Sequence, residues 1–358
     1  MSAAHHAPPK VLLIKTSSLG DVIHTLPAIT DAARAIPGIT FDWVVEESFA
    51  EIPSWHPGVE RVIPVAIRRW RKNIFSTLRN GEWGQFREQL KSAHYDLIID
   101  AQGLLKSAVL TQGLESPVHG LDKESAREPL AAKFYTHSYD VPKGQHAVER
   151  IRQLFAKALN YQIPEEKGNF ALDRSMFDDF SHMRPPRPYL VFVHGTTWED
   201  KHWPESYWLE LAQKATSAGY IICLPWGNDH ERQRAERIAN IGPGILVLPK
   251  LPLKGVAAII AGATKVVAVD TGLGHLTAAL EIPAVSLYGP TSPVLVGAYG
   301  EVQKHLTLAD CPKLSLDEQA KVSVSPAIFA PMTPDIVWQA MALDKINWIN
   351  QSHQEPMP

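Results

Sequence analysis

Short apolar runs alternate with helix-like segments along most of this 358-residue chain, and this alternation constrains its fold more than any other feature. Residues 11–14 are four apolar residues followed by a turn cluster, which is typical of a strand buried on both faces. Strands that alternate with helices predict a parallel sheet covered by helices on both sides, which is an α/β fold. Further strands are expected at 42–46, 61–66 and 95–100, with helices at 21–36, where Pro27 predicts a kink or a late start, and at 86–93.

A second series of the same kind follows a proline-rich stretch at residues 184–188. A proline restricts the residue before it to extended conformations, so this stretch is predicted to be a linker. A helix opening at Pro204 is expected to end at Gly219, because glycine is favoured just beyond a helix C-terminus. Strands are expected at 189–194, 220–226, 245–248, 265–270 and 284–288, and the other helices at 229–241, 253–263 and 272–280.

The length of the chain favours two domains, and the linker places their boundary. The predicted domains are residues 1–183 and 184–333, each a doubly wound sheet, followed by a C-terminal helix and tail at 334–358. Thr333 and Pro334 are a favourable helix start, with an N-cap and then a proline in the first turn. The apolar stripe of this helix is expected at Ile336, Ala340, Leu343 and Ile346. No structure is assigned to most of residues 301–330.

The composition excludes several classes of protein. A formal net charge of −3 argues against a general nucleic-acid binder, which normally carries a basic excess. The 45% of hydrophobic residues can form a sizeable core, and two cysteines cannot form a disulfide framework. No stretch reaches the roughly 18–20 apolar residues of a membrane span, and the first residues lack a signal peptide. A cytoplasmic protein is expected, and contact with a membrane surface stays open.

Two loops that follow predicted strands carry the chemistry. After the first strand, Ser18, Gly20 and Asp21 suit a tight turn whose backbone N–H groups favour an anion. The glycine spacing there fits neither a Walker A loop nor a dinucleotide fingerprint. After a later strand, Asp270 precedes residues 271–274, whose N–H groups at a helix start could hold a diphosphate without a metal. For Asp21 and for Asp270 the alternative reading is a residue that only caps its helix.

One basic cluster stands out at residues 68–72, where four cations surround Trp70. It predicts either an anionic partner, such as a membrane surface, or a solvated loop. Arg127 is also expected to belong to this basic cluster. The fifteen histidines show no metal-ligand spacing and no paired acids follow a strand, so no metal site is predicted.

Residues 15–28 resemble the N-terminal signature of the lipopolysaccharide heptosyltransferases, which form glycosyltransferase family 9. Residues 270–279 resemble the nucleotide-diphosphate motif of that family. The stretches 41–47, 67–72, 100–103 and 200–204 are similar to the members that add the first heptose of the inner core. The resemblance extends from about residue 10 to about residue 300.

This resemblance implies a GT-B fold, with two Rossmann-like domains facing a central cleft and a C-terminal helix that packs back on the first domain. It implies an inverting transfer of L-glycero-D-manno-heptose from ADP-L-glycero-β-D-manno-heptose to the first Kdo of Kdo₂-lipid A. The enzyme would need no cofactor and would bind peripherally to the cytoplasmic face of the inner membrane. Asp21 would be the general base and Lys201 the contact to the leaving phosphates. The implied donor-binding residues are Thr196, Thr197, Glu231, Leu251, Asp270, Thr271, Gly272, Leu273 and His275, and the implied acceptor-binding residues are Ser18, Gly20, Arg68, Arg69, Arg71, Lys72, Gln102 and Arg127.

Two other functions stay open on the sequence. The nearer one is a family member that acts on an already heptosylated core. The other, from a different class, is a non-catalytic protein that binds nucleotide sugars. A nicotinamide-dependent dehydrogenase is disfavoured because its glycine fingerprint is missing.

Overall fold

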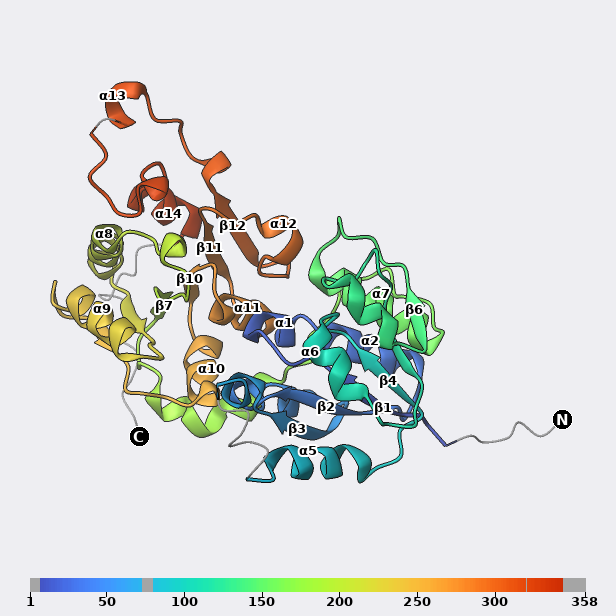
Figure 1. The fold of residues 1–358 in the computed structure, drawn as a ribbon. Coiled ribbons are helices and arrows are strands. Elements are labelled where there is room, and N and C mark those ends of the chain that lie inside the picture. The colour runs from blue at the N-terminus through green and yellow to red at the C-terminus, as the bar shows by residue number, and fades with distance from the viewer. Residues whose placement is uncertain (1–6, 73–79, 320, 344–358) are drawn as a thin grey trace, which may run out of the picture. The chain divides into compact units, whose positions relative to one another are not determined.

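The computed structural model describes residues 7–72, 80–319 and 321–343. The chain divides into two compact units, residues 1–173 and 174–358 (Figure 1). The division falls before the proline-rich stretch at 184–188. The reason is that the preceding 3₁₀ segment η5 (Arg174–Met183) packs on helix α10 (Leu253–Ala261) and so belongs to the second unit.

The first unit is built on a parallel six-stranded sheet with the order β3-β2-β1-β4-β5-β6. Both faces are covered by helices, as the apolar runs predicted. Phe86 of α5 packs with Leu12 and Ile14 of β1 on one face, and Phe155 of α7 stacks on Phe41 of β2. The strands are β1 (Lys10–Ile14), β2 (Thr40–Glu46), β3 (Val59–Val65), β4 (Leu97–Asp100), β5 (Val118–Leu121) and β6 (His137–Tyr139). The helices include α1 (Leu19–Ile23), α2 (Leu26–Ala35), α3 (Ile67–Trp70), α5 (Glu82–Lys91), α6 (Leu105–Ala108) and α7 (Ala147–Leu159).

The predicted helix at 21–36 is two helices, α1 and α2. Pro27 lies in the first turn of α2, where its missing N–H costs no hydrogen bond, so the predicted late start is confirmed. Strands β5 and β6 are missing from the sequence prediction. Both are short, and β6 consists of His137, Ser138 and Tyr139, which form no apolar run.

The second unit repeats the architecture with the order β12-β11-β10-β7-β8-β9. The predicted end of α8 is confirmed: Gly219 has a φ of +94°, and the Tyr220 N–H donates to the Ala215 carbonyl in a Schellman arrangement. The strands are β7 (Tyr189–Val193), β8 (Ile221–Leu224), β9 (Ile245–Val247), β10 (Lys265–Val269), β11 (Ala284–Tyr288) and β12 (Gln303–Thr307). Besides α10, the helices include α8 (Glu205–Ser217), α9 (Asp229–Ala239), α11 (Gly272–Ala279), α12 (Pro293–Val296), α13 (Leu316–Gln319) and α14 (Pro334–Met341).

Helix α14 starts at Pro334 as predicted, but it packs within the second unit, against α8 and strand β11. The expectation that the C-terminal helix packs back on the first domain stays a prediction. Residues Val337, Ala340 and Met341 of α14 belong to the second core, because that core lies on their side of the helix. Ile336 and Leu343 of the predicted stripe are only partly buried, and Ile346 lies outside the described residues.

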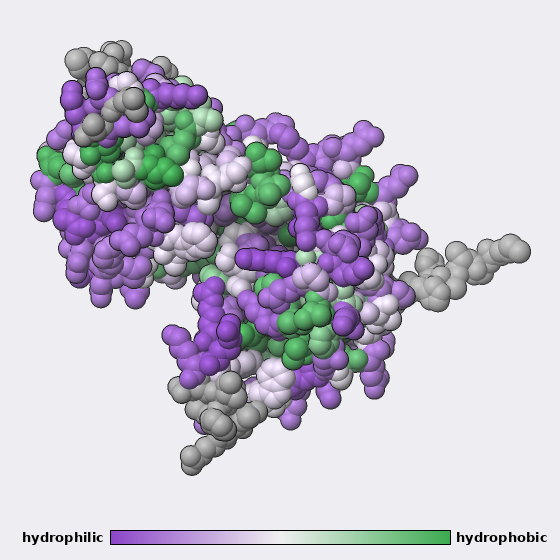
Figure 2. Space-filling model, turned by 45° about the horizontal axis from the view of Figure 1, so that its top comes forward, coloured by the Kyte–Doolittle hydropathy of each residue, from purple (hydrophilic) through white to green (hydrophobic). Residues whose placement is uncertain are grey.

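Among the described residues, no helix is long and apolar enough to cross a membrane. The face in Figure 2 is largely hydrophilic, with apolar side chains gathered in small patches, as is usual for a protein surface.

Candidate functional site

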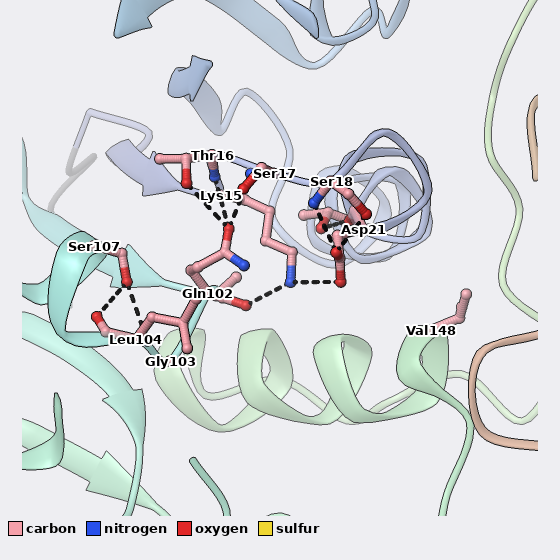
Figure 3. A network of polar contacts seen from close by, with 12 residues as sticks. Lys15, Thr16, Ser17, Ser18, Asp21, Gln102, Gly103, Leu104, Ser107 and Val148 are labelled. Atoms are coloured by element: carbon pink, nitrogen blue, oxygen red, sulfur yellow. Dashed lines mark hydrogen bonds and ion pairs between the residues drawn. The ribbon is translucent and has the colours of Figure 1, made fainter. Parts of the chain in front are cut away.

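In the first unit, the turn between β1 and α1 presents Asp21. Ser18 is the N-cap of α1, and its backbone N–H and its hydroxyl donate to Oδ2 of Asp21 at 2.7 and 2.9 Å (Figure 3). The capping interpretation of Asp21 therefore holds for one of its two oxygens. The other oxygen, Oδ1, lies 3.7 Å from Nζ of Lys15, and the side chain is 34% exposed. Asp21 thus caps its helix, and its carboxylate remains partly exposed.

The surroundings of Asp21 favour its ionised form. Burial by itself raises the pKa of this carboxyl, but the charge of Lys15, the two hydrogen bonds from Ser18 and the charge of Arg127 lower it. The net pKa lies below the ordinary value for aspartate. Asp21 is therefore an ionised acceptor of protons at neutral pH.

Gln102, from the turn after β4, ties that turn to the one after β1. Its side-chain oxygen accepts hydrogen bonds from the backbone N–H groups of Thr16 and Ser17 at 2.9 and 3.1 Å, and it is buried (Figure 3). At the end of β4, the buried carboxylate of Asp100 accepts a hydrogen bond from the Ser107 hydroxyl. The oxygen of Gln102 is thus occupied by the loop that carries Ser18 and Gly20.

The basic cluster is interleaved with acids that sequence spacing does not reveal. Arg69 pairs with both Glu47 and Glu82, and the indole N–H of Trp70 donates to Glu82. Trp70 packs edge-on against Phe86 in the core. The exposed residues Arg68, Arg71 and Lys72 carry the rest of the cluster, and Arg127 lies in the loop after β5.

Lys106 is missing from the predicted site residues. Its ammonium donates to the Ser17 hydroxyl at 3.0 Å, beside the turn that holds Asp21. Burial lowers the pKa of Lys106, and the carboxylates of Glu46 and Asp21 oppose that shift. Its position in the sequence could have identified Lys106 as a candidate, because it lies in the segment after β4 as Asp21 lies in the segment after β1.

In the second unit, the structure brings Lys201 and Asp270 together. Nζ of Lys201 lies 2.6 Å from Oδ2 of Asp270, and both side chains are largely buried. The same oxygen accepts from the Thr291 hydroxyl at 2.8 Å, and the Thr196 hydroxyl donates to the Asp270 carbonyl at 3.1 Å. The ammonium also lies 4.9 Å from the centre of the exposed Trp198 ring. Thr291 is absent from the predicted site residues. It lies in the loop after β11, so the expectation that functional residues follow strands could have identified it.

Asp270 leads directly into α11, whose N-cap is Thr271. The N–H groups of the first turn of a helix have no partner within the helix, so those of Gly272 and Leu273 are available to an anion. A Cβ added at Gly274 would lie 3.5 Å from Cβ of Ala268, which is an ordinary van der Waals contact, so the start of the helix lies close to β10. His275 is buried in the same turn.

Glu231 lies in the first turn of α9, after β8. Its carboxylate accepts from the Gly227 N–H at 2.7 Å, and its own N–H donates to the Asn228 side chain. A Cβ at Gly195, two residues beyond the end of β7, would lie 2.6 Å from Cδ of Glu231. Glu231 thus lies against the loop that carries Thr196 and the exposed Thr197. Leu251, before α10, is half-buried against Gly255.

In each unit the candidate residues gather at the carboxyl ends of parallel strands, where doubly wound sheets bind their ligands. Within the part of the chain that the structure describes, no group of three His, Cys, Asp or Glu side chains could hold a metal ion. Two Rossmann-like units with such sites define the GT-B class of glycosyltransferases.

The chain belongs to glycosyltransferase family 9 (heptosyltransferase), whose family model matches residues 83–323. Lipopolysaccharide heptosyltransferase 1 of Pseudomonas aeruginosa is 63% identical over 298 residues, which are 83% of each chain. The solved structure of the E. coli heptosyltransferase WaaC with ADP has a TM-score of 0.83 at 50% identity, and the match covers 93% of this chain and 98% of that one. Lipopolysaccharide heptosyltransferase 2 of E. coli K12 is only 25% identical, over 79% of this chain and 84% of its own.

Proposed function

We propose that this enzyme transfers L-glycero-D-manno-heptose from ADP-L-glycero-β-D-manno-heptose to the first Kdo of Kdo₂-lipid A. The 63% identity to heptosyltransferase 1 of Pseudomonas aeruginosa far exceeds the 25% identity to heptosyltransferase 2 of E. coli, which supports this acceptor over the heptosylated core. The observation that carries the catalytic proposal is the ionised, partly exposed carboxylate of Asp21 at the end of β1.

Asp21 is the proposed general base. It accepts the proton of the acceptor hydroxyl as that oxygen attacks the anomeric carbon and the ADP leaves from the opposite face, which inverts the centre. Ser18 holds one oxygen of the carboxylate, and the other remains for the hydroxyl. Ser18 and Gly20 also form the floor of the proposed acceptor site.

The donor is proposed to bind the second unit. The N–H groups of Thr271, Gly272 and Leu273 and the loop with Thr196 and Thr197 would hold the diphosphate, with His275 close by. Glu231 would accept from the ribose and Leu251 would contact the adenine. Lys201 pairs with Asp270 in this structure, so the donor would enter between them, with its phosphate at Lys201 and its sugar at Asp270. The lysine and the N–H groups then stabilise the charge of the departing ADP without a metal.

The acceptor carries phosphates and carboxylates, which suit the basic cluster. Because Glu47 and Glu82 already balance Arg69, the attraction falls mainly on Arg68, Arg71 and Lys72, with Arg127 beside the base. Gln102 would contribute by holding the loop under the acceptor. We place the enzyme on the cytoplasmic face of the inner membrane, where it would reach a lipid acceptor.

The test is transfer from ADP-heptose to Kdo₂-lipid A by the wild type and by Asp21→Asn. Loss of the base should lower kcat by about 10²–10⁴-fold, with ADP binding retained. Asp96→Asn, which precedes β4 at the amino ends of the strands of the same sheet, is the matched control. Full activity of Asp21→Asn would show that Asp21 is not the general base. Transfer only to a heptosylated core would reassign the acceptor, and loss of activity in EDTA would contradict the metal-free mechanism.

A further inference from the structure

Lys15 is a buried lysine that none of the roles proposed above uses. It follows β1 directly and is 5% exposed. Its ammonium donates to the Ala101 carbonyl at 3.0 Å and lies 3.7 Å from Oδ1 of Asp21 (Figure 3). A buried ammonium is costly unless it has such partners. A lysine held at this position therefore needs a reason.

The backbone of Lys15 is fixed by the neighbouring strands. Its N–H donates to the Val44 carbonyl of β2, and its carbonyl accepts from the Trp43 indole N–H at 2.9 Å. The side chain crosses to the turn after β4, while Gln102 of that turn reaches back to the loop after Lys15. These reciprocal bonds tie the ends of β1 and β4 together. They place the ammonium beside the carboxylate independently of any substrate.

We infer that Lys15 is a positioning residue for Asp21, which holds Oδ1 of the carboxylate in place while Ser18 holds Oδ2. Opposed hydrogen bonds and an ion pair on the two oxygens limit rotation of the carboxylate. This inference rests on the proposed function, in which Asp21 is the base. It adds a residue that controls the charge and the orientation of that base.

Other charged groups also act on Asp21. Arg127 contributes less than Lys15 to the low pKa of Asp21. The Lys106 ammonium interacts with Asp21 and also with Glu46, Arg68 and Arg71. Lys15 differs from these groups because the structure gives it a direct ion pair with the carboxylate. Its removal should therefore move the titration of Asp21 more than removal of Arg127.

The experiment compares the wild type with Lys15→Met, which keeps the aliphatic stem without the charge, and with Lys15→Arg, which restores the charge. Lys10→Met, at the other end of β1, is the matched control. Two quantities are measured. The pKa of Asp21 is read by ¹³C NMR of labelled aspartate, assigned with Asp21→Asn, and the acid limb is read from the pH profile of kcat/KM.

In Lys15→Met we expect the pKa of Asp21 to rise by about one unit or more, as expected for loss of an adjacent opposite charge. The acid limb should move with it. The plateau kcat should fall roughly tenfold or more because the base loses its orientation, while KM for the donor changes little. Lys15→Arg should return the acid limb towards the wild type, and Arg127→Met should move it less.

An unchanged pKa of Asp21 in folded Lys15→Met would overturn the inference, whatever the result for Asp21→Asn. If the pKa of Asp21 rises in Lys15→Met but the acid limb of the kcat/KM profile does not move, the effect of Lys15 on Asp21 is supported. That result would instead show that Asp21 is not the general base. If Lys15→Met does not fold, the same measurements are made on Lys15→Gln, and the pKa of Asp21 is measured in the wild type. A wild-type pKa at or above the ordinary value for aspartate would overturn the inference.

Discussion

At the scale of single residues, Gly195 leaves space for the side chain of Glu231, the proposed ribose contact. Its carboxylate lies against Gly195 and accepts from the N–H of Gly227, so two loops after neighbouring strands meet at one side chain. A methyl group at position 195 would lie 2.6 Å from Cδ of Glu231, so an alanine there requires the Glu231 side chain to move.

We therefore predict that Gly195→Ala displaces Glu231 and weakens ADP binding by about 1–3 kcal/mol, the usual cost of overpacking. That range corresponds to roughly a fivefold to 150-fold rise in Kd, measured by calorimetry. Gly242→Ala is the control, since a Cβ there meets nothing within 4 Å. Equal Kd values for the two variants would show that Glu231 does not contact the nucleotide.

At the scale of elements, the stretch that the sequence left without structure is part of the second core. Phe329, in the 3₁₀ segment η8 (Ala327–Phe329), is fully buried, and a Cβ at Gly289 would collide with its ring. The Met332 carbonyl accepts from the Trp203 indole N–H at 2.9 Å. These contacts hold the segment against the loop after β11 and against Trp203, just before α8.

We predict that Phe329→Ala lowers the free energy of unfolding of the second unit by about 3–5 kcal/mol, as for other buried phenylalanines. Urea denaturation measures this change. Ile328→Ala is the matched control, because Ile328 is the adjacent residue and is 41% exposed. A cost for Phe329→Ala no greater than that for Ile328→Ala would mean that the segment does not contribute to the core.

At the scale of the whole molecule, each unit contains a histidine that the fold keeps neutral. Burial lowers the pKa of His56 in the first unit to about 4 and that of His194 in the second to about 3. For His56 the hydrogen bonds agree, because Nδ1 accepts from the Gly58 N–H and leaves the proton on Nε2, beside Thr30.

The unfolded chain binds a proton on His56 near the ordinary value of 6.5, whereas the folded protein does so only near 4. Between these values the unfolded state holds more protons, so stability falls as the pH is lowered. We predict a loss of about 1.4 kcal/mol for each pH unit of this window from His56 alone. His56→Gln should remove that contribution from the slope of urea stability against pH, with exposed His94→Gln as the control. An unchanged slope in His56→Gln would contradict the prediction.

The sequence by itself determined most of both sheets and the places where polar residues follow strands. Apolar runs, prolines and glycines act over a few residues, so their effects can be read locally, as at Pro27 and Gly219. Strands β5, β6 and β12 were not predicted, because neighbouring strands stabilise them rather than their own apolar pattern.

Only the tertiary structure decided which of these residues meet. Lys201 and Asp270 are 69 positions apart and form one ion pair, and Thr291 joins them from a third strand end. Glu47 and Glu82 balance Arg69, and α14 packs in the second core. The physical reason is the same in each case. Local propensity depends on neighbours in sequence, whereas charge pairing and burial depend on distances that arise only when the strands align.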